Sequence, residues 1–183
     1  MSQGYSMKHI GITIVVSLIV VVLISPLLRP KGESLAGSAA EATPEVRAAV
    51  EAYRDTMTGV LHDSEVKFKA GTGSMAELLL AQLACDLARL EFFALDAPGG
   101  NGAARAVVKI YYLGKLRTLA QTPGALDDTT RIRITQEECL ARIELAGKET
   151  ELSGNEAFAE ARAEWERNPA PENLKRMFEA ELK

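Results

Sequence analysis

The sequence has few of the residues from which catalytic and metal sites are usually built. Its 183 residues include two histidines, His9 and His62, and two cysteines, Cys85 and Cys139. Neither cysteine belongs to a Cys-x-x-Cys pair, which is the spacing most typical of zinc sites, and two histidines do not complete a ligand set. We therefore expect no metal site, no catalytic residues and no bound cofactor, and we predict that the protein is not an enzyme.

Positive charge is also scarce. Residues 44–183 carry 18 Lys and Arg against 23 Asp and Glu, a net charge of −5. Because a nucleic-acid-binding domain needs a basic surface, this balance argues against nucleic acid as a general partner. With 47% apolar and 25% charged residues, the chain has the composition of an ordinary globular domain with appendages.

What the sequence does contain is one long apolar run. Residues 10–28, IGITIVVSLIVVVLISPLL, form 19 positions without a charge, and they lie between Lys8 and Arg29. As a helix they would span about 28 Å, close to the hydrocarbon thickness of a bilayer. We predict a transmembrane anchor at residues 10–28, preceded by an N-terminal tail of residues 1–9.

Two other interpretations of this run stay open. A cleaved signal peptide needs small residues soon after its apolar core, but SLAGSAA (residues 34–40) comes only after Arg29, Lys31 and two prolines. A buried core helix fits poorly beside a stretch rich in Gly, Ser and Ala. The short N-terminal tail favours insertion that exports the rest of the chain.

An all-α domain is predicted beyond a flexible linker of residues 29–43, which is small, polar and without hydrophobic period. Apolar residues then recur at spacings of three and four, interrupted by Gly- and Pro-containing breaks. This pattern predicts a bundle of about four helices in antiparallel hairpins (residues 44–148) and an acidic tail with two short helices (residues 149–183). The expected helices cover residues 44–69, 75–95, 103–121, 128–146, 155–167 and 171–182.

The periodicity also predicts which faces are buried. Few polar residues interrupt positions 75–95, so this helix should be central. Its outward strip is expected to be Gln82, Asp86 and Arg89. In the helix over 128–146, the apolar positions in register are Ile132, Cys139, Ile143 and Ala146, although TRIRIT (residues 130–135) alternates like a strand.

The turn within KFKAGTGSMAELLLAQ (residues 67–82) has two interpretations. Glycines before a helix N-terminus can hold a phosphate, and two lysines are close by. A P-loop, however, needs a preceding strand and a final Gly-Lys-Ser/Thr, and this stretch has neither. We predict that Gly71 ends one helix and that Ser74 and Glu77 form a capping box for the next.

Other side chains also have a structural and a functional interpretation. Cys85 and Cys139 are expected to be small buried hydrophobes, with a disulfide as the alternative. His62 is expected on a solvated helix face, and Phe158 and Trp165 are expected to anchor the tail on the core. Tyr111 and Tyr112, with Lys109 and Lys115, suit either an anionic polymer or lipid headgroup, or one core tyrosine beside a solvated basic face.

Charge is distributed unevenly along the domain. No acid occurs between Ala97 and Leu126, so the helix over 103–121 is basic. Residues 149–183, in contrast, hold nine acids and five bases. Our hypothesis is that the acidic tail docks on this basic helix, which would make its position sensitive to salt.

The domain contains a weak internal repeat. Gly71, Ser74 and LARLE (residues 87–91) recur 53 positions later as Gly124, Asp127 and LARIE (residues 140–144). Serine and aspartate are both good helix N-caps, so the turn chemistry is repeated as well. Two similar hairpins of this kind would bury their apolar faces against each other.

Residues 43–92 resemble the repeated helical segment of TolC-type outer-membrane efflux proteins, and more closely TolC-like repeats of membrane-anchored or secreted bacterial proteins. The positions that carry the resemblance are Phe68, Ala70, Gly71, Gly73, Ser74, Leu80, Ala81, Gln82, Ala88, Arg89, Leu90 and Glu91. The resemblance implies a helical hairpin and an envelope location. It does not imply a channel, because the chain lacks the long hairpins and barrel strands of the complete efflux proteins.

Together these observations predict a single-pass protein of the bacterial inner membrane with its helical domain in the periplasm. Its expected role is a non-enzymatic scaffold or assembly subunit. Its expected partners are the lipid bilayer, through residues 10–28, and copies of itself or another envelope protein. The alternative is a sensory module on a membrane anchor that binds a small molecule or an anion.

Overall fold

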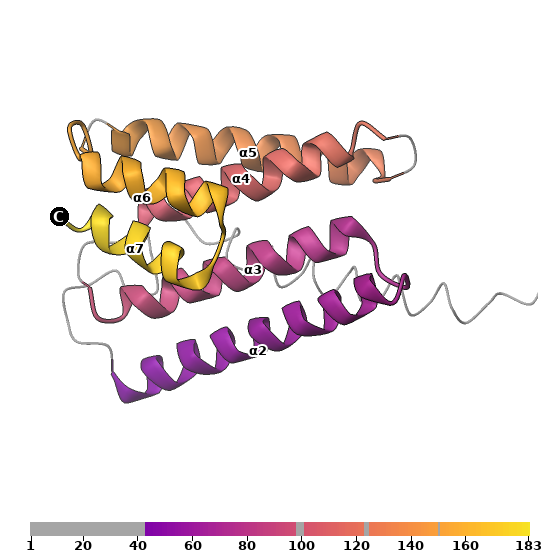
Figure 1. Ribbon diagram of the computed structural model, residues 1–183, viewed down its shortest axis with the longest axis horizontal. Coiled ribbons are helices and arrows are strands. Elements are labelled where there is room, and N and C mark those ends of the chain that lie inside the picture. The colour runs from indigo at the N-terminus through magenta and orange to yellow at the C-terminus, as the bar shows by residue number, and fades with distance from the viewer. Residues whose placement is uncertain (1–42, 98–100, 123–124, 150) are drawn as a thin grey trace, which may run out of the picture. The chain divides into compact units, whose positions relative to one another are not determined.

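The computed structural model describes residues 43–97, 101–122, 125–149 and 151–183, and all regular elements in these ranges are α-helices. They are α2 (Pro44–Lys69), α3 (Met75–Ala94), α4 (Gly102–Leu119), α5 (Asp128–Glu149), α6 (Glu156–Arg167) and α7 (Pro171–Glu181) (Figure 1). The all-α prediction is confirmed for this part of the chain. The predicted anchor at residues 10–28 and the linker up to residue 42 lie outside the described residues.

Local sequence determines where these helices begin and end. Thr43 caps α2, and Pro44 occupies the first helical position, where a missing amide costs nothing. The predicted capping box is present: Ser74 Oγ accepts the Glu77 amide at 3.1 Å, and the Glu77 carboxylate accepts the Ser74 amide at 2.8 Å. Gly71, before it, has a φ of +71°, in the left-handed region that favours glycine.

Two antiparallel hairpins, α2–α3 and α4–α5, pack on each other through α3 and α4 (Figure 1). The C-terminal helices complete this core, because α7 contacts both α3 and α4 and α6 contacts α4. The prediction that the helix over 75–95 is central is confirmed. The largest fully buried side chains come from these central and C-terminal helices: Leu90, Val107, Val108, Leu116, Trp165, Leu174 and Met177.

The two hairpins share their turn chemistry, as the sequence repeat predicts. Asp127 precedes α5 as Ser74 precedes α3, and its Oδ1 accepts the amide of Thr130 at 2.9 Å. Each cap therefore binds the amide three residues further on. Gly124, the counterpart of Gly71, lies outside the described residues.

Two predictions about buried faces were wrong. Asp86, which was assigned to the outward strip of α3, is only 3% exposed, because Tyr112 and Arg89 satisfy its carboxylate inside the protein. The α5 helix is turned the other way from the prediction, and TRIRIT is helical. Its buried residues are Ile134, Glu138, Ala141 and Leu145, whereas Ile132, Cys139, Ile143 and Ala146 are exposed.

Candidate functional site

The backbone amides of the elbow between α2 and α3 are engaged within the protein. Those of Gly71, Thr72 and Gly73 donate to carbonyl oxygens in the last turn of α2 at 2.9–3.0 Å, and that of Ser74 donates to the capping carboxylate. A Cβ at Gly73 would lie 3.0 Å from Lys67 Cβ, so the turn needs glycine there for close packing. These contacts make the elbow a helix–helix turn, because an anion would have to displace existing hydrogen bonds.

A buried carboxylate, that of Asp86, joins α3 to α4. The Tyr112 hydroxyl donates to Asp86 Oδ2 at 2.9 Å, and Arg89 Nη1 donates to Oδ1 at 2.8 Å. Burial raises the pKa of Asp86, although these two hydrogen bonds act in the opposite direction. Since both carboxylate oxygens have partners, the group is suited to holding two helices together rather than to exchanging protons with a substrate.

Acids on neighbouring helices neutralise much of the charge of the basic helix α4. Arg105 forms an ion pair with Glu91 of α3, which is buried. Arg117 Nε lies 3.2 Å from Glu138 Oε2 of α5, and Glu138 Oε1 also accepts two hydrogen bonds from Arg142. Arg105 and Arg117 of the basic helix therefore serve the packing of α3, α4 and α5.

The two adjacent tyrosines of α4 are part of the same packing. Tyr112 is in the core, and the Tyr111 ring packs on Trp165 of α6 with a centroid distance of 4.9 Å. Lys115 Nζ lies 4.2 Å from the Tyr111 ring centroid, and burial lowers the pKa of Lys109. This arrangement matches the predicted core tyrosine, with Lys109 half-buried rather than free for a polyanion.

The acidic tail docks on the basic helix α4. It contacts the backbone amides at the N-terminus of α4 rather than the basic side chains of that helix. One carboxylate of α7, Glu181, accepts the amides of Ala103 and Ala104 in the first turn of α4, each at 2.8 Å. Asn101, the residue in the N-cap position, makes no side-chain cap hydrogen bond. Glu181 thus supplies the missing cap of α4 from a distant part of the sequence.

The remaining sequence candidates lie apart from one another. Cys85 is fully buried on α3, as predicted, but Cys139 is exposed on α5, and each is a free thiol. His62 is on the exposed face of α2, and Trp165 and Phe158 are buried where the C-terminal helices meet the core. Within the described ranges, no group of three or more His, Cys, Asp or Glu residues has a metal-binding arrangement.

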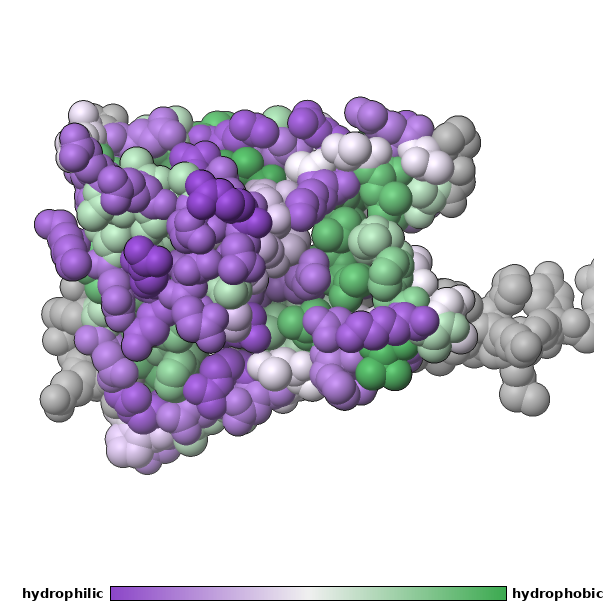
Figure 2. All heavy atoms as spheres, viewed as in Figure 1, coloured by the Kyte–Doolittle hydropathy of each residue, from purple (hydrophilic) through white to green (hydrophobic). Residues whose placement is uncertain are grey.

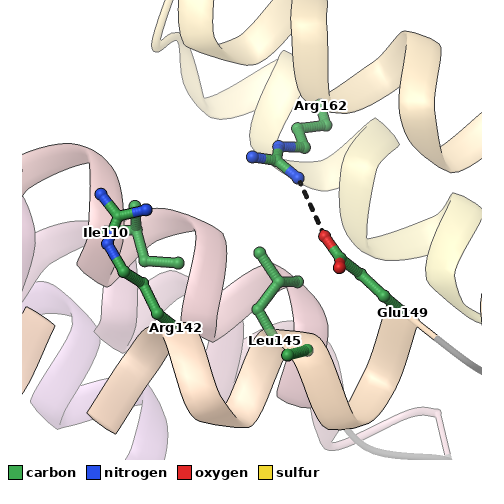
Figure 3. Close-up of a pocket in the computed structure, with 6 residues that line it drawn as sticks. Ile110, Arg142, Leu145, Glu149 and Arg162 are labelled. Atoms are coloured by element: carbon green, nitrogen blue, oxygen red, sulfur yellow. Dashed lines mark ion pairs between the residues drawn. The ribbon is translucent and has the colours of Figure 1, made fainter. Parts of the chain in front are cut away.

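One open cavity of about 220 Å³ lies among α4, α5 and α6 (Figure 3). Its wall combines apolar side chains with Glu149, Arg142 and Arg162: the full lining is Ile110, Arg142, Leu145, Ala146, Glu149 and Arg162. Arg142 is paired with Glu138, and Arg162 with Glu166 and, at 4.0 Å, with Glu149. Both arginines of this cavity therefore already have acidic partners.

Besides Leu182 after α7, large apolar side chains of the described residues are exposed in two groups. One is the elbow of α2 and α3, where Figure 2 shows apolar residues gathered around a hollow between α3 and α4. The exposed large residues there are Val66, Phe68 and Met75. The other is the outer side of α5, where Ile132 is 59%, Leu140 54% and Ile143 69% exposed.

In comparisons with known proteins, no family model, no curated protein and no solved structure matches the chain. Among the residues that the structure describes, none of the helices combines the length and apolar character needed to cross a bilayer. Sequence reasoning missed the roles of Glu91, Glu138 and Glu181. Only Glu138 had an indication in the sequence, since Arg142 follows it four residues later on the same helix.

Proposed function

We propose that this protein is a membrane-anchored helical scaffold or assembly subunit of the bacterial cell envelope. In this proposal, residues 10–28 form a single uncleaved span, and the helical domain faces the periplasm. The observation that carries the proposal is the order of segments: a 19-residue uncharged run, a linker rich in small residues, and a domain built of helices.

The polar groups of the domain support a scaffold rather than an enzyme. Among the described residues, the buried acids are Asp86, Glu91 and Glu138. Each forms an ion pair with an arginine, and the Tyr112 hydroxyl also donates to Asp86. Such pairs fix the relative positions of helices. A catalytic carboxylate would instead need an oxygen directed at a substrate.

The resemblance to TolC-like repeats is a second, independent support for an envelope role. It rests on the motif residues around the elbow, and α2 and α3 form a hairpin at that elbow. A sensory module is the weaker candidate. Its best binding site would be the cavity among α4, α5 and α6, which at about 220 Å³ is smaller than typical ligand pockets of about 300–1,000 Å³.

The test is the membrane association of the full chain expressed in a bacterium. We expect the wild-type chain to remain in the membrane pellet after alkaline carbonate extraction, and its domain to be digested by protease only when the outer membrane is opened. A Val15→Lys, Val21→Lys double variant should be extracted, because two charges in the middle of the run oppose insertion. The matched control, Ser34→Lys with Ser38→Lys, adds the same charge in the linker and should stay in the pellet.

Three results would contradict the proposal. A carbonate-soluble wild-type chain would exclude the anchor. A mature N-terminus close to residue 40 would replace the anchor by a signal peptide. Digestion of the domain only after the inner membrane is lysed would place it in the cytoplasm.

A further inference from the structure

The outer side of α5 is apolar, and no described helix covers it. Its inner side packs on α4, whereas Ile132, Cys139, Leu140 and Ile143 all point away from the domain. Ala146, which is exposed at the edge of the cavity among α4, α5 and α6, continues this face, and the five residues lie at spacings of three, four and seven along a 22-residue helix. We refer to Ile132, Cys139, Leu140, Ile143 and Ala146 as the α5 outer stripe.

We propose that the α5 outer stripe pairs with the same stripe of a second copy, with the two helices antiparallel and related by a two-fold axis beside Cys139. Cys139 is close to the middle of α5, which runs from Asp128 to Glu149. A two-fold axis at that point sets Ile132 of each copy against Ala146 of the other. It also buries all five apolar residues of both copies in one isologous interface.

The charges beside the stripe favour this antiparallel arrangement. The N-terminal half of α5 carries Arg131 and Arg133, and the C-terminal half carries Glu144 and Glu149, all of them exposed. An antiparallel pair places Arg131 near Glu149 of the second copy and Arg133 near its Glu144. A parallel pair would instead set each arginine beside the same arginine of the second copy, and each glutamate beside the same glutamate.

Asp128 and Arg142, two further charges of α5, already have partners within the chain, as Arg131 and Glu149 also do. Asp128 is 2.9 Å from Arg131, and Arg142 is 2.7 Å from Glu138. They therefore add little repulsion between the copies. Exposed ion pairs contribute little to affinity, so these charges select the direction of pairing, while the apolar stripe supplies most of the affinity.

The small residues of the stripe allow the helices to approach closely. Packed helices lie about 8–10 Å apart, and Cα atoms lie about 2.3 Å from each helix axis. Two Cys139 residues facing each other across the axis would therefore have their Cα atoms about 3.5–5.5 Å apart, within reach of a short thiol cross-linker. Cys85 is fully buried and provides an internal thiol that should not react.

The pairing rests on the proposed anchor for its strength. One pair of 22-residue helices buries less surface than a stable soluble dimer needs. Confinement of both copies to one membrane raises their effective concentration, as in other tethered systems. A two-fold axis along the membrane normal lets both anchors enter the same bilayer.

The first experiment measures pairing of the full chain in lipid vesicles, by energy transfer between dye-labelled copies at decreasing protein-to-lipid ratios. We expect Ile143→Lys to weaken the pairing at least about tenfold, because it puts a charge in the middle of the apolar interface. The matched control is Val66→Lys on α2, where the native valine is 52% exposed. It should pair like the wild type.

The second experiment determines the direction of pairing by cross-linking cysteines with a short bismaleimide in membranes. Wild-type chains should cross-link through Cys139, and Cys139→Ser should abolish this product. In the Cys139→Ser background, Ile132→Cys copies mixed with Ala146→Cys copies should cross-link. Ile132→Cys alone should not, whereas a parallel pair would give the reverse result.

A charge reversal gives the third test. Arg131→Glu should weaken the energy transfer, and adding Glu149→Arg to the same chain should restore it. A monomeric wild type, or equal effects of Ile143→Lys and Val66→Lys, would overturn the proposal. Lipid or another part of the chain would then be the partner that covers the stripe. Carbonate extraction of Ile143→Lys separates this failure from failure of the anchor, because loss of pairing alone leaves the variant in the membrane.

Discussion

The role of Glu181 as the N-terminal cap of α4 can be tested by an isosteric substitution. Glu181→Gln keeps the size of the side chain but replaces one carboxylate oxygen by an NH₂ group. The two native acceptors lie 2.8 Å from the amides of Ala103 and Ala104. In the variant, one of those amides would face a donor, so one hydrogen bond is lost and the charge that complements the helix dipole is removed.

The expected cost follows from these two contributions. A hydrogen bond to a charged group stabilises by about 1.5–3 kcal/mol, and the dipole interaction adds about 0.3–1 kcal/mol. Glu181 is only half-buried, which favours the lower ends of both ranges. We expect Glu181→Gln to lower the free energy of unfolding by about 2 kcal/mol. With a urea m-value of about 2 kcal/mol per M, the unfolding midpoint would fall by about 1 M.

The measurement is urea unfolding of the full chain in one detergent, followed by far-UV circular dichroism. The matched control is Glu179→Gln on the same helix, where the exposed carboxylate is 3.7 Å from Lys175. Loss of that surface pair should cost less than about 0.5 kcal/mol. Equal midpoints for the two variants would refute the view that Glu181 caps α4.

Three further predictions concern single positions. Burial raises the pKa of Asp86, so the native state binds the proton of this carboxyl group more tightly than the unfolded state does. The stability of the wild type relative to Asp86→Asn should therefore fall as the pH rises from about 4 through the folded-state pKa. Parallel curves of stability against pH for the two proteins would contradict this. Gly71→Ala should destabilise the domain by about 1 kcal/mol, because φ at this position is +71°. Gly59→Ala in α2 should instead stabilise it by about 0.5–1 kcal/mol, since no heavy atom lies within 4 Å of the new Cβ; thermal unfolding measures both effects. The fluorescence of Trp165, the single tryptophan, should keep its blue-shifted maximum as NaCl rises from about 0.05 to 1 M, since apolar contacts hold the tail; a red shift would indicate electrostatic docking.

The ends of the helices could be predicted from sequence because their determinants are local. Ser74 and Glu77 lie three residues apart, and Gly71 and Pro44 act through their own backbone. The all-α class and the central position of α3 also followed from local information. A run with few polar residues can be satisfied only by neighbours on several sides.

The roles of the acids could not be predicted in this way, because each depends on a helix that is distant in sequence. Glu181 binds amides 77 and 78 residues away, and Asp86 meets Tyr112 26 residues further on. In the sequence, Glu91 has no feature that distinguishes it from other helix residues, and only the fold brings Arg105 beside it. Hydrophobic periodicity counts such acids as exposed, since it contains no information about which partner will neutralise them.

The same limitation explains why the orientation of α5 was predicted wrongly, and it gives the outer stripe its significance. The helix has two candidate stripes, and the one with Ile132, Cys139 and Ile143 is the more apolar by composition. The other contains Glu138, which is acceptable inside only because Arg117 and Arg142 reach it. The arginines thus favour burial of the less apolar side of α5. The more apolar side is left on the surface, where a hydrophobic stripe is costly unless it is covered. If Glu138→Leu strengthened the domain but left pairing through Ile143 unchanged, the two sides of α5 would be shown to serve separate purposes, one for the fold and one for assembly.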